Sequence, residues 1–181
     1  MELNSEIALT ILSGRGISLV GHGDEVELSS YIIDFEKLFE EYLREALRLR
    51  MPELTPGATV RSGGTEPKHP LFEDTGLSTA EPDIIVDLPP DKRVVAEIKY
   101  RDKVEREDIN QAITYGCSLR VKNSVLVFQS PVGTPSELKR LGATNGVNIY
   151  TYAFDLANPD LEAEEKRFVE VMQRLAETCR N

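Results

Sequence analysis

Apolar residues recur at every third or fourth position along residues 29–50, which is the spacing of one face of an α-helix. That face consists of Phe35, Leu38, Phe39, Tyr42, Leu43, Ala46 and Leu47. Ser29 and Ser30 are candidate N-caps, because a hydroxyl there can accept a hydrogen bond from a backbone N–H of the first turn. We therefore predict an amphipathic helix over residues 29–50, followed by a linker over residues 51–58 that contains prolines and a glycine.

Two more long segments have helical spacing. The first is residues 105–119, and its predicted apolar face consists of Ile109, Ala112, Ile113 and Gly116. The second runs through residues 162–179, with Asn158 as the expected cap and Pro159 as the expected first residue, where the missing N–H of proline costs nothing. The first of these helices separates two groups of predicted strands.

Three less regular segments accompany the long helices. Residues 5–13 predict a short helix that ends at Gly14. Residues 134–142 predict a second short helix, with Thr134 as its cap. The turn-rich stretch over residues 63–82 is expected to be a long loop or a wide hairpin.

Runs of β-branched and aliphatic residues predict the strands. Residues 83–88 and 93–100 are two such runs, and the short Pro-Pro-Asp-Lys turn between them favours a hairpin. Residues 123–129 and 147–154 predict two further strands, and residues 59–62 predict a short one. The chain therefore alternates helices with groups of strands.

The length of 181 residues favours one domain, and 40% hydrophobic residues are enough for a core. We expect a single domain over residues 1–181, with an N-terminal helix and loop (1–28), a central core (29–130), and a C-terminal strand and helix (131–181). No apolar run has the ~18–20 residues of a membrane span, and the start lacks the basic region of a signal peptide. These features predict a cytoplasmic protein.

The charge of the chain limits the function classes. The net charge is −10 and the pI is about 4.8, whereas proteins that coat nucleic acid are usually basic. Two cysteines and two histidines are few for a structural zinc or iron–sulfur site, which needs about four ligands. An acidic enzyme whose carboxylates are neutralised by metal ions remains compatible with this composition.

Three charged residues are predicted to converge at one end of the hairpin. Because side chains alternate along a strand, Glu97 and Lys99 share a face, and Asp83 can face them from the neighbouring strand. Asp83 and Glu97 supply the oxygen ligands that Mg²⁺ prefers, and the carbonyl of Ile98 could add another. Metal-activated water attacks phosphorus, and Lys99 could hold or deprotonate that water or stabilise charge on the phosphate. The simpler alternative is an exposed ion pair between Glu97 and Lys99.

Two helices carry further polar candidates. Gln111 and Tyr115 are four residues apart and therefore project from the same side of their helix, away from the centre of its apolar face. They could contact a nucleotide or position the lysine, or they could form a half-exposed flank. On the 29–50 helix, Glu40 lies at the edge of the apolar face and Glu36 lies within its wider arc. A carboxylate there is either solvated at the rim or directed into a cleft.

Four motifs occur in a fixed order: the helix IIDFEKLFEEYL, Glu-Pro-Asp at residues 81–83, Glu-Ile-Lys at residues 97–99, and Gln-Ala-Ile-Thr-Tyr at residues 111–115. The set resembles the PD-(D/E)XK nuclease superfamily, and more narrowly the nuclease domain of McrC, the cleaving subunit of methylcytosine-dependent restriction systems. The resemblance covers most of residues 5–130. Each motif is weak alone, whereas their order and spacing are specific. The resemblance implies an α/β fold with a restriction-endonuclease-like mixed β-sheet flanked by helices, which agrees with the predicted order of elements.

The resemblance also implies an activity, a Mg²⁺-dependent DNA endonuclease that hydrolyses phosphodiester bonds. Asp83 and Glu97 would bind Mg²⁺, or Mn²⁺ in its place, and Lys99 would be the catalytic lysine. Glu40 would be an additional acid near the metal, acting directly or through water. The implied supporting or substrate-binding residues are Gln111 and Tyr115.

The resemblance to McrC also implies a protein in two parts, in which an N-terminal region docks on a GTP-driven AAA+ motor ring. This chain is too short to contain that region and the nuclease, so we expect a nuclease domain alone, a fragment, or a stand-alone relative. The expected partners are DNA and an AAA+ GTPase motor subunit, and cleavage of both strands would favour a homodimer. The alternative is a catalytically silent nuclease-fold module for protein or nucleic-acid binding, which the acidic charge favours.

Overall fold

The computed structural model describes residues 34–178, and the short helix predicted over residues 5–13 lies outside this range. Six strands form one mixed sheet in the order β1-β4-β5-β6-β8-β7. The strands of this sheet are β1 (Thr59–Arg61), β4 (Ile84–Leu88), β5 (Lys92–Lys99), β6 (Asn123–Gln129), β7 (Glu137–Thr144) and β8 (Val147–Phe154). β5, β6 and β8 are parallel, whereas β1, β4 and β7 run antiparallel to their neighbours.

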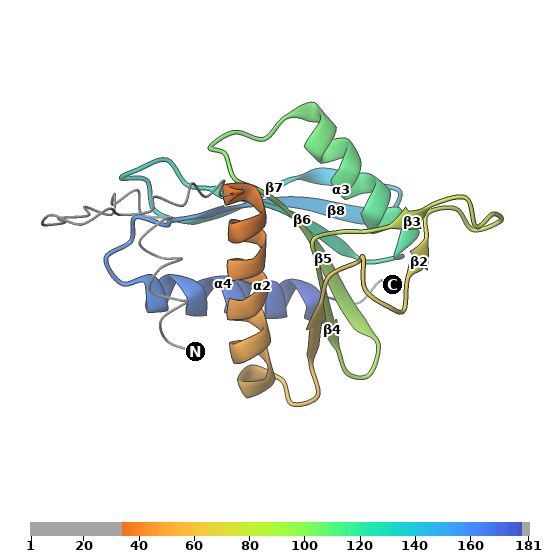
Figure 1. The fold of residues 1–181 in the computed structure, drawn as a ribbon, viewed down its shortest axis with the longest axis horizontal. Helices are drawn as coiled ribbons and strands as arrows, with labels where there is room; N and C mark the ends of the chain where they lie inside the picture. Colours follow the sequence, from red (N-terminus) through yellow and green to blue (C-terminus); the bar gives the residue numbers. More distant parts are fainter. Residues whose placement is uncertain (1–33, 179–181) are drawn as a thin grey trace, which may run out of the picture.

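Three helices cover the two faces of the sheet. α2 (Phe35–Leu54) and α4 (Leu161–Glu177) lie on one face, and α3 (Arg106–Ser118) lies on the other (Figure 1). This arrangement confirms the predicted mixed sheet flanked by helices. None of the helices within the described range is long and apolar enough to cross a membrane.

The alternation of side chains along β5 decides which residues enter the core. Val94, Ala96 and Ile98 point into the large apolar cluster beneath α2 and α4, together with Phe39 and Phe168 of those helices. The intervening positions face the α3 side, where a smaller apolar cluster is built around Ile85 and Val95. The sheet therefore buries both faces, and a charged residue near the end of β5 needs a specific partner.

The predicted strands and the hairpin between β4 and β5 are confirmed. Ile84 pairs with Ala96 and Leu88 pairs with Lys92 in an antiparallel ladder. The turn-rich stretch before β4 forms the wide hairpin, in which β2 (His69–Pro70) pairs with β3 (Thr79–Ala80). The helix predicted over residues 105–119 is confirmed as α3.

The predicted limits of the first long helix are wrong at both ends. α2 begins at Phe35, and the side chain of Asp34 caps it by accepting a hydrogen bond from the Lys37 N–H at 3.1 Å. Ser29 and Ser30, the predicted caps, lie outside the described residues. At the other end α2 continues through Pro52 to Leu54, because the fully buried Met51 extends its apolar face beyond the predicted end. Burial of that face outweighs the cost of the internal proline.

The short helix predicted over residues 134–142 is a strand. Residues 137–144 form β7, which pairs antiparallel with β8 at the edge of the sheet. The predicted cap, Thr134, lies in the preceding turn, where its N–H donates to the carbonyl of Pro131. Backbone pairing with a neighbouring strand has overridden the helix propensity of this Glu-Leu-Lys-Arg-Leu sequence.

The predicted start of the last helix is also wrong, by two residues. α4 begins at Leu161, and the cap is Asp160, whose side chain accepts a hydrogen bond from the Ala163 N–H at 3.0 Å. Asn158, the predicted cap, instead accepts a hydrogen bond from the Asp160 N–H in the turn before the helix. Asn158 and Asp160 are two residues apart and either side chain can cap a helix, so periodicity could not show which of them does.

Candidate active site

Glu97 and Lys99 lie on the same face at the end of β5, as their spacing predicts. The Lys99 Nζ donates to Glu97 Oε1 at 3.0 Å. Glu97 is only 3% exposed, which excludes the alternative of an exposed surface ion pair. Lys99 also lies 3.7 Å from Glu36 Oε1, so the ammonium bridges β5 and α2.

Asp83 precedes β4 and faces the end of β5. Its Oδ2 accepts a hydrogen bond from the backbone N–H of Ile98 at 2.7 Å. Because N–H and C=O of one strand residue point to the same side, the Ile98 carbonyl is also directed to the β4 side, beyond the last β4–β5 pair of Ile84 with Ala96. The structure thus brings Asp83, Glu97 and the Ile98 backbone together.

Gly63 supports the backbone that carries Asp83. The Gly63 N–H donates to the carbonyl of Pro82 at 2.8 Å. A Cβ atom at Gly63 would lie 2.4 Å from Pro82 Cδ and 2.6 Å from Pro82 N, distances that no side chain can occupy. The absence of a side chain at this position therefore allows the loop after β1 to pack directly on the Pro-Asp motif.

α2 contributes two further charged groups. Glu40 is half-buried, and the negative charge of Asp83 and the positive charges of Arg44 and Lys99 act on it. The Arg44 Nη1 donates to the backbone carbonyl of Asp83 at 3.0 Å, which ties α2 to the start of β4. α2, the helix predicted to carry an accessory acid, thus brings both an acidic side chain, Glu40, and a positively charged one, Arg44, to the site.

The carboxylates of the site are held in surroundings that disfavour their charge. Burial, and then the charge of Asp83, raise the pKa of Glu97, while Lys99 opposes the shift. Burial also raises the pKa of Asp83, against the lowering effects of the Ile98 N–H and of Lys99. Burial and Asp83 raise the pKa of Glu40 to about 7. For Lys99, burial favours the neutral amine, but Glu97 and Asp83 outweigh it and raise the pKa, so the side chain stays protonated.

Gln111 and Tyr115 lie together on α3, as predicted from their spacing. The Gln111 Nε2 donates to the Tyr115 hydroxyl at 3.1 Å. Burial raises the pKa of Tyr115, and the charges of Glu97 and Asp83 raise it further, which places the phenol within electrostatic reach of both carboxylates. Tyr115 therefore borders the site from the α3 side, with Gln111 holding its hydroxyl.

The residues present fit a divalent cation. Glu97 Oε2 is buried and has no hydrogen-bond partner among the described residues, which is unfavourable without a ligand. Within residues 34–178, no three His, Cys, Asp or Glu side chains form a ready-made metal cage. Mg²⁺ does not need one, because it commonly binds through one or two carboxylates and keeps positions for water and substrate phosphate. Asp83, Glu97 and the Ile98 carbonyl provide that kind of donor set.

Three residues of the site were not singled out from the sequence as functional. Arg44 follows Glu40 by one helical turn, and this spacing could have predicted that both side chains point to the same side of the helix. The sequence places Glu36 on the helix face but does not identify Lys99 as its partner. Gly63 carried no signal beyond being a glycine in a turn-rich segment, because its contact with Pro82 depends on how the loop folds back.

Comparison with solved structures supports the fold. One chain of the refined half-complex from the tetradecameric assembly of Thermococcus gammatolerans McrB AAA+ hexamers with bound McrC matches with a TM-score of 0.57 and 18% identity. The match covers 80% of this chain and 34% of that one, so the present chain spans about a third of the length of its structural relative. The likeness agrees with the predicted restriction-endonuclease-like sheet.

The sequence comparison identifies the family. No curated protein is a significant match to the chain. The family model described as the McrBC 5-methylcytosine restriction system component matches residues 2–129, which is more than half of the sequence. The chain therefore belongs to the family of McrBC 5-methylcytosine restriction system components.

Proposed function

We propose that the chain is the cleavage domain of a McrBC-type restriction system and hydrolyses phosphodiester bonds in DNA with Mg²⁺ or Mn²⁺. The convergence of Asp83, Glu97 and Lys99 carries this proposal, and the unpartnered buried oxygen of Glu97 supports a cation there. Membership of the restriction-system family supports the same conclusion. Asp83, Glu97 and the Ile98 carbonyl would hold the metal, which when bound activates water and offsets negative charge on the phosphate.

The role assigned to Lys99 is to stabilise the negative charge that develops on the phosphate. Its raised pKa keeps it protonated, so it acts as a hydrogen-bond donor and not as a base. The bond to Glu97 and the contact with Glu36 fix its position before substrate binds. A preorganised ammonium in a partly buried site stabilises a transition state more strongly than one in water.

Glu40 is assigned to proton transfer. In hydrolysis the water oxygen bonds to phosphorus, the bond from phosphorus to the leaving oxygen breaks, the attacking water gives up a proton, and the leaving oxygen takes up a proton from solvent. In the metal-free protein the pKa of Glu40 is raised to about 7, so this carboxylate can accept a proton near neutral pH. Gln111 and Tyr115 border the same site and would position the substrate or the lysine.

An AAA+ motor is the proposed partner of the whole protein. The structural relative belongs to an assembly of McrB AAA+ hexamers with bound McrC. Coupling to such a GTP-driven motor would supply the DNA translocation and specificity that we do not assign to any described element. Cleavage of both strands would further require two nuclease sites, for which a homodimer is the simplest source.

Cleavage of supercoiled plasmid tests the proposal. Wild type, Lys99→Ala and the control Lys103→Ala are compared with Mg²⁺ or Mn²⁺, alone and with an McrB-type motor and GTP. Lys103 is an exposed lysine just after β5, so its loss removes the same charge without touching the site. We expect cutting by wild type and Lys103→Ala, and a loss of at least about a hundredfold in Lys99→Ala. Equal cutting by all three would contradict the proposed mechanism.

Metal binding measured by calorimetry distinguishes an intact nuclease site from the alternative, a catalytically silent nuclease-fold module. If no protein cuts the plasmid under any of these conditions but Asp83 and Glu97 still bind Mg²⁺, the site is intact and lacks its correct partner or substrate. If wild type neither cuts DNA nor binds metal, the chain is a silent nuclease-fold module that binds protein or nucleic acid.

A further inference from the structure

Aromatic rings gather at the end of β5 that carries the candidate active site. The rings of Phe35 and Tyr100 are stacked, with their centroids 5.7 Å apart and their planes inclined by 14°. Phe39 meets the ring of Tyr100 edge-on, also at 5.7 Å between centroids. Phe39 is fully buried, whereas Phe35 remains 37% exposed. The aromatic cluster therefore runs from the core to the surface, and Phe35 is its exposed end.

This exposed end lies beside Lys99. Phe35 and Glu36 are the first two residues of α2. Lys99 ends β5, and Tyr100 follows it. The stacked rings of Phe35 and Tyr100 form one contact between these two segments. The next contact joins Lys99 Nζ to Glu36 Oε1 at 3.7 Å. An aromatic ring is consequently the neighbour of the ammonium group that we assign to the phosphate.

The end of β5 is open on its β4 side. Pairing between β4 and β5 stops at Ala96, so residues 97–100 have no β4 neighbour. Alternation places Lys99 on the α3 face and Tyr100 on the α2 face, where Tyr100 packs against the large apolar cluster. The ammonium of Lys99 nevertheless reaches Glu36 of α2, so it lies at this open edge. A DNA strand that follows the edge would meet the ammonium and the aromatic pair together.

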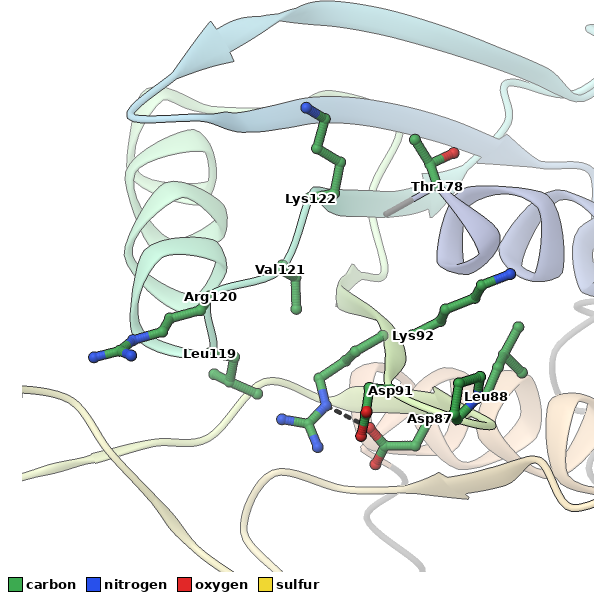
Figure 2. A pocket seen from close by; sticks show the side chains of 11 residues that line it. Asp87, Leu88, Asp91, Lys92, Leu119, Arg120, Val121, Lys122 and Thr178 are labelled. Atoms are coloured by element: carbon green, nitrogen blue, oxygen red, sulfur yellow. Dashed lines mark hydrogen bonds and ion pairs between the residues drawn. The ribbon is translucent and has the colours of Figure 1, made fainter. Parts of the chain in front are cut away.

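The other end of β5 offers no comparable surface. Figure 2 shows the hollow at that end, where Asp87 and Asp91 accompany Lys92 and the charge is therefore mixed. None of the residues that line this hollow is aromatic, so a nucleotide base has no ring to stack on there. Of the two ends of β5, it is the end with Lys99 that combines a cationic group with an exposed ring.

We propose that Phe35, backed by Tyr100, is a stacking surface for a nucleotide base of the DNA strand whose phosphate lies at Lys99. This inference rests on the proposed nuclease function and adds a substrate-binding residue to it. Every base has a π face, so stacking would hold the strand without selecting a sequence. A base that stacks on Phe35 must be unpaired, so the substrate strand is single-stranded or locally opened at the site. The alternative is that Phe35 only ends the apolar face of α2 and needs no ligand.

The test compares two oligonucleotides of equal length, one of thymidine and one of stable abasic nucleotides, which share their phosphates and differ in their bases. Binding of each to the full chain is followed by fluorescence anisotropy with Ca²⁺ in place of Mg²⁺, since Ca²⁺ also takes carboxylate ligands. Phe35→Leu keeps an apolar side chain against Tyr100 but removes the aromatic face, whereas Phe35→Tyr keeps both. The matched control is Phe72→Leu, which changes a phenylalanine that is 51% exposed in the loop between β2 and β3.

We expect Phe35→Leu to raise the Kd for the thymidine oligomer about tenfold and to leave the Kd for the abasic oligomer unchanged. Phe35→Tyr and Phe72→Leu should bind both oligomers as wild type does. Equal changes of Kd for both oligomers in Phe35→Leu, including no change for either, would overturn the proposal, because a purely structural ring cannot distinguish them. A wild type that binds the two oligomers equally, or binds neither, would overturn it as well. Plasmid cleavage by the same preparations decides separately whether the nuclease function stands.

Discussion

Glu40 sits where its neutral form is favoured, and this should be visible as a dependence of stability on pH. Burial and Asp83 raise its pKa from 4.5 to about 7. Because the folded-state pKa exceeds the unfolded value, its contribution to stability is fully present below about pH 4.5 and is lost as the pH rises through about 7. In metal-free protein at pH 8, Glu40→Gln should therefore be more stable than wild type. After allowance for solvent screening we expect about 1 kcal/mol, or about 2–4 °C in Tm.

Thermal unfolding in EDTA between pH 5 and pH 8 measures this effect. Glu41→Gln is the control, because Glu41 is the exposed neighbour on the same helix. The gap between Glu40→Gln and wild type should narrow toward pH 5. A gap that is absent at pH 8, or that Glu41→Gln reproduces, would show that Glu40 is solvated at the rim.

Arg44 is expected to matter for the site, and Arg48, one turn further along α2, is not. Arg44 holds the carbonyl of Asp83, and its charge offsets the repulsion between Glu40 and Asp83. Arg48 pairs with the exposed Glu45 at the surface and makes no other ion pair within residues 34–178. Loss of one charge-assisted hydrogen bond should make Arg44→Ala cut DNA about tenfold more slowly and bind Mg²⁺ more weakly. Plasmid cleavage and calorimetry measure both effects, and equal behaviour of the two variants would remove Arg44 from the site.

Sequence reasoning predicted the positions that depend on local periodicity. Alternation along a strand put Glu97 and Lys99 on one face, and helical spacing put Gln111 beside Tyr115. The contacts of Arg44 and Gly63 with the Pro-Asp segment join residues that are far apart in sequence, and no local pattern encodes them. Family resemblance supplied Glu40, and the packing of α2 then explains why an acid on that helix can reach the site.

At the level of the elements, the loop after β1 must approach the start of β4 without a side chain. Gly63→Ala would place Cβ 2.4 Å from Pro82 Cδ and close to its backbone, so the Pro-Asp segment must move. We expect a loss of about 1–3 kcal/mol in the free energy of unfolding and a clear loss of cleavage. Gly64→Ala is the matched control, since its Cβ would meet only ordinary contacts at 3.7 and 3.9 Å. Urea unfolding and plasmid cleavage of both variants decide the point, and equal stability of the two would contradict the close packing.

The elements that sequence reasoning missed are those whose secondary structure depends on pairing with neighbouring elements. Residues 137–144 have helix-forming side chains but pair with β8, and the two strands form the edge of the sheet that is farthest from the site. The β4–β5 hairpin was predicted because its strands, turn and apolar content agree with one another locally. The site is built on this hairpin, which explains why an error at the far edge did not affect the interpretation of the carboxylates.

On the scale of the whole molecule, negative charge is concentrated where the metal is proposed. Glu36, Glu40, Asp83 and Glu97 act on one another and on Lys99, in a chain with a net charge of −10. Such a cluster cannot attract DNA by itself, since phosphate carries the same sign. Bound cations would reverse the local sign. Binding of DNA at this site should therefore depend on divalent metal.

Thermal stability offers a test of that charge arrangement which does not require activity. A ligand that binds only the folded state stabilises it, and at ten times its Kd the gain is about 1.4 kcal/mol. Mg²⁺ in the millimolar range should therefore raise the Tm of wild type by about 3–5 °C. Asp83→Asn should lose most of this rise because it removes one of the two proposed carboxylate ligands, whereas the exposed control Asp102→Asn should keep it.

General screening of an acidic protein also raises Tm, so each measurement is paired with NaCl at equal ionic strength. The rise that is specific to Mg²⁺ should be larger at pH 8 than at pH 6, since the pKa values of Glu40, Asp83 and Glu97 are all raised and more of these groups must release a proton before a cation binds at the lower pH. A rise that is the same in Asp83→Asn and wild type, or that NaCl reproduces, would mean that the carboxylates are screened but do not bind metal. That result would contradict the proposed metal-dependent mechanism, although the fold and the family would be unaffected.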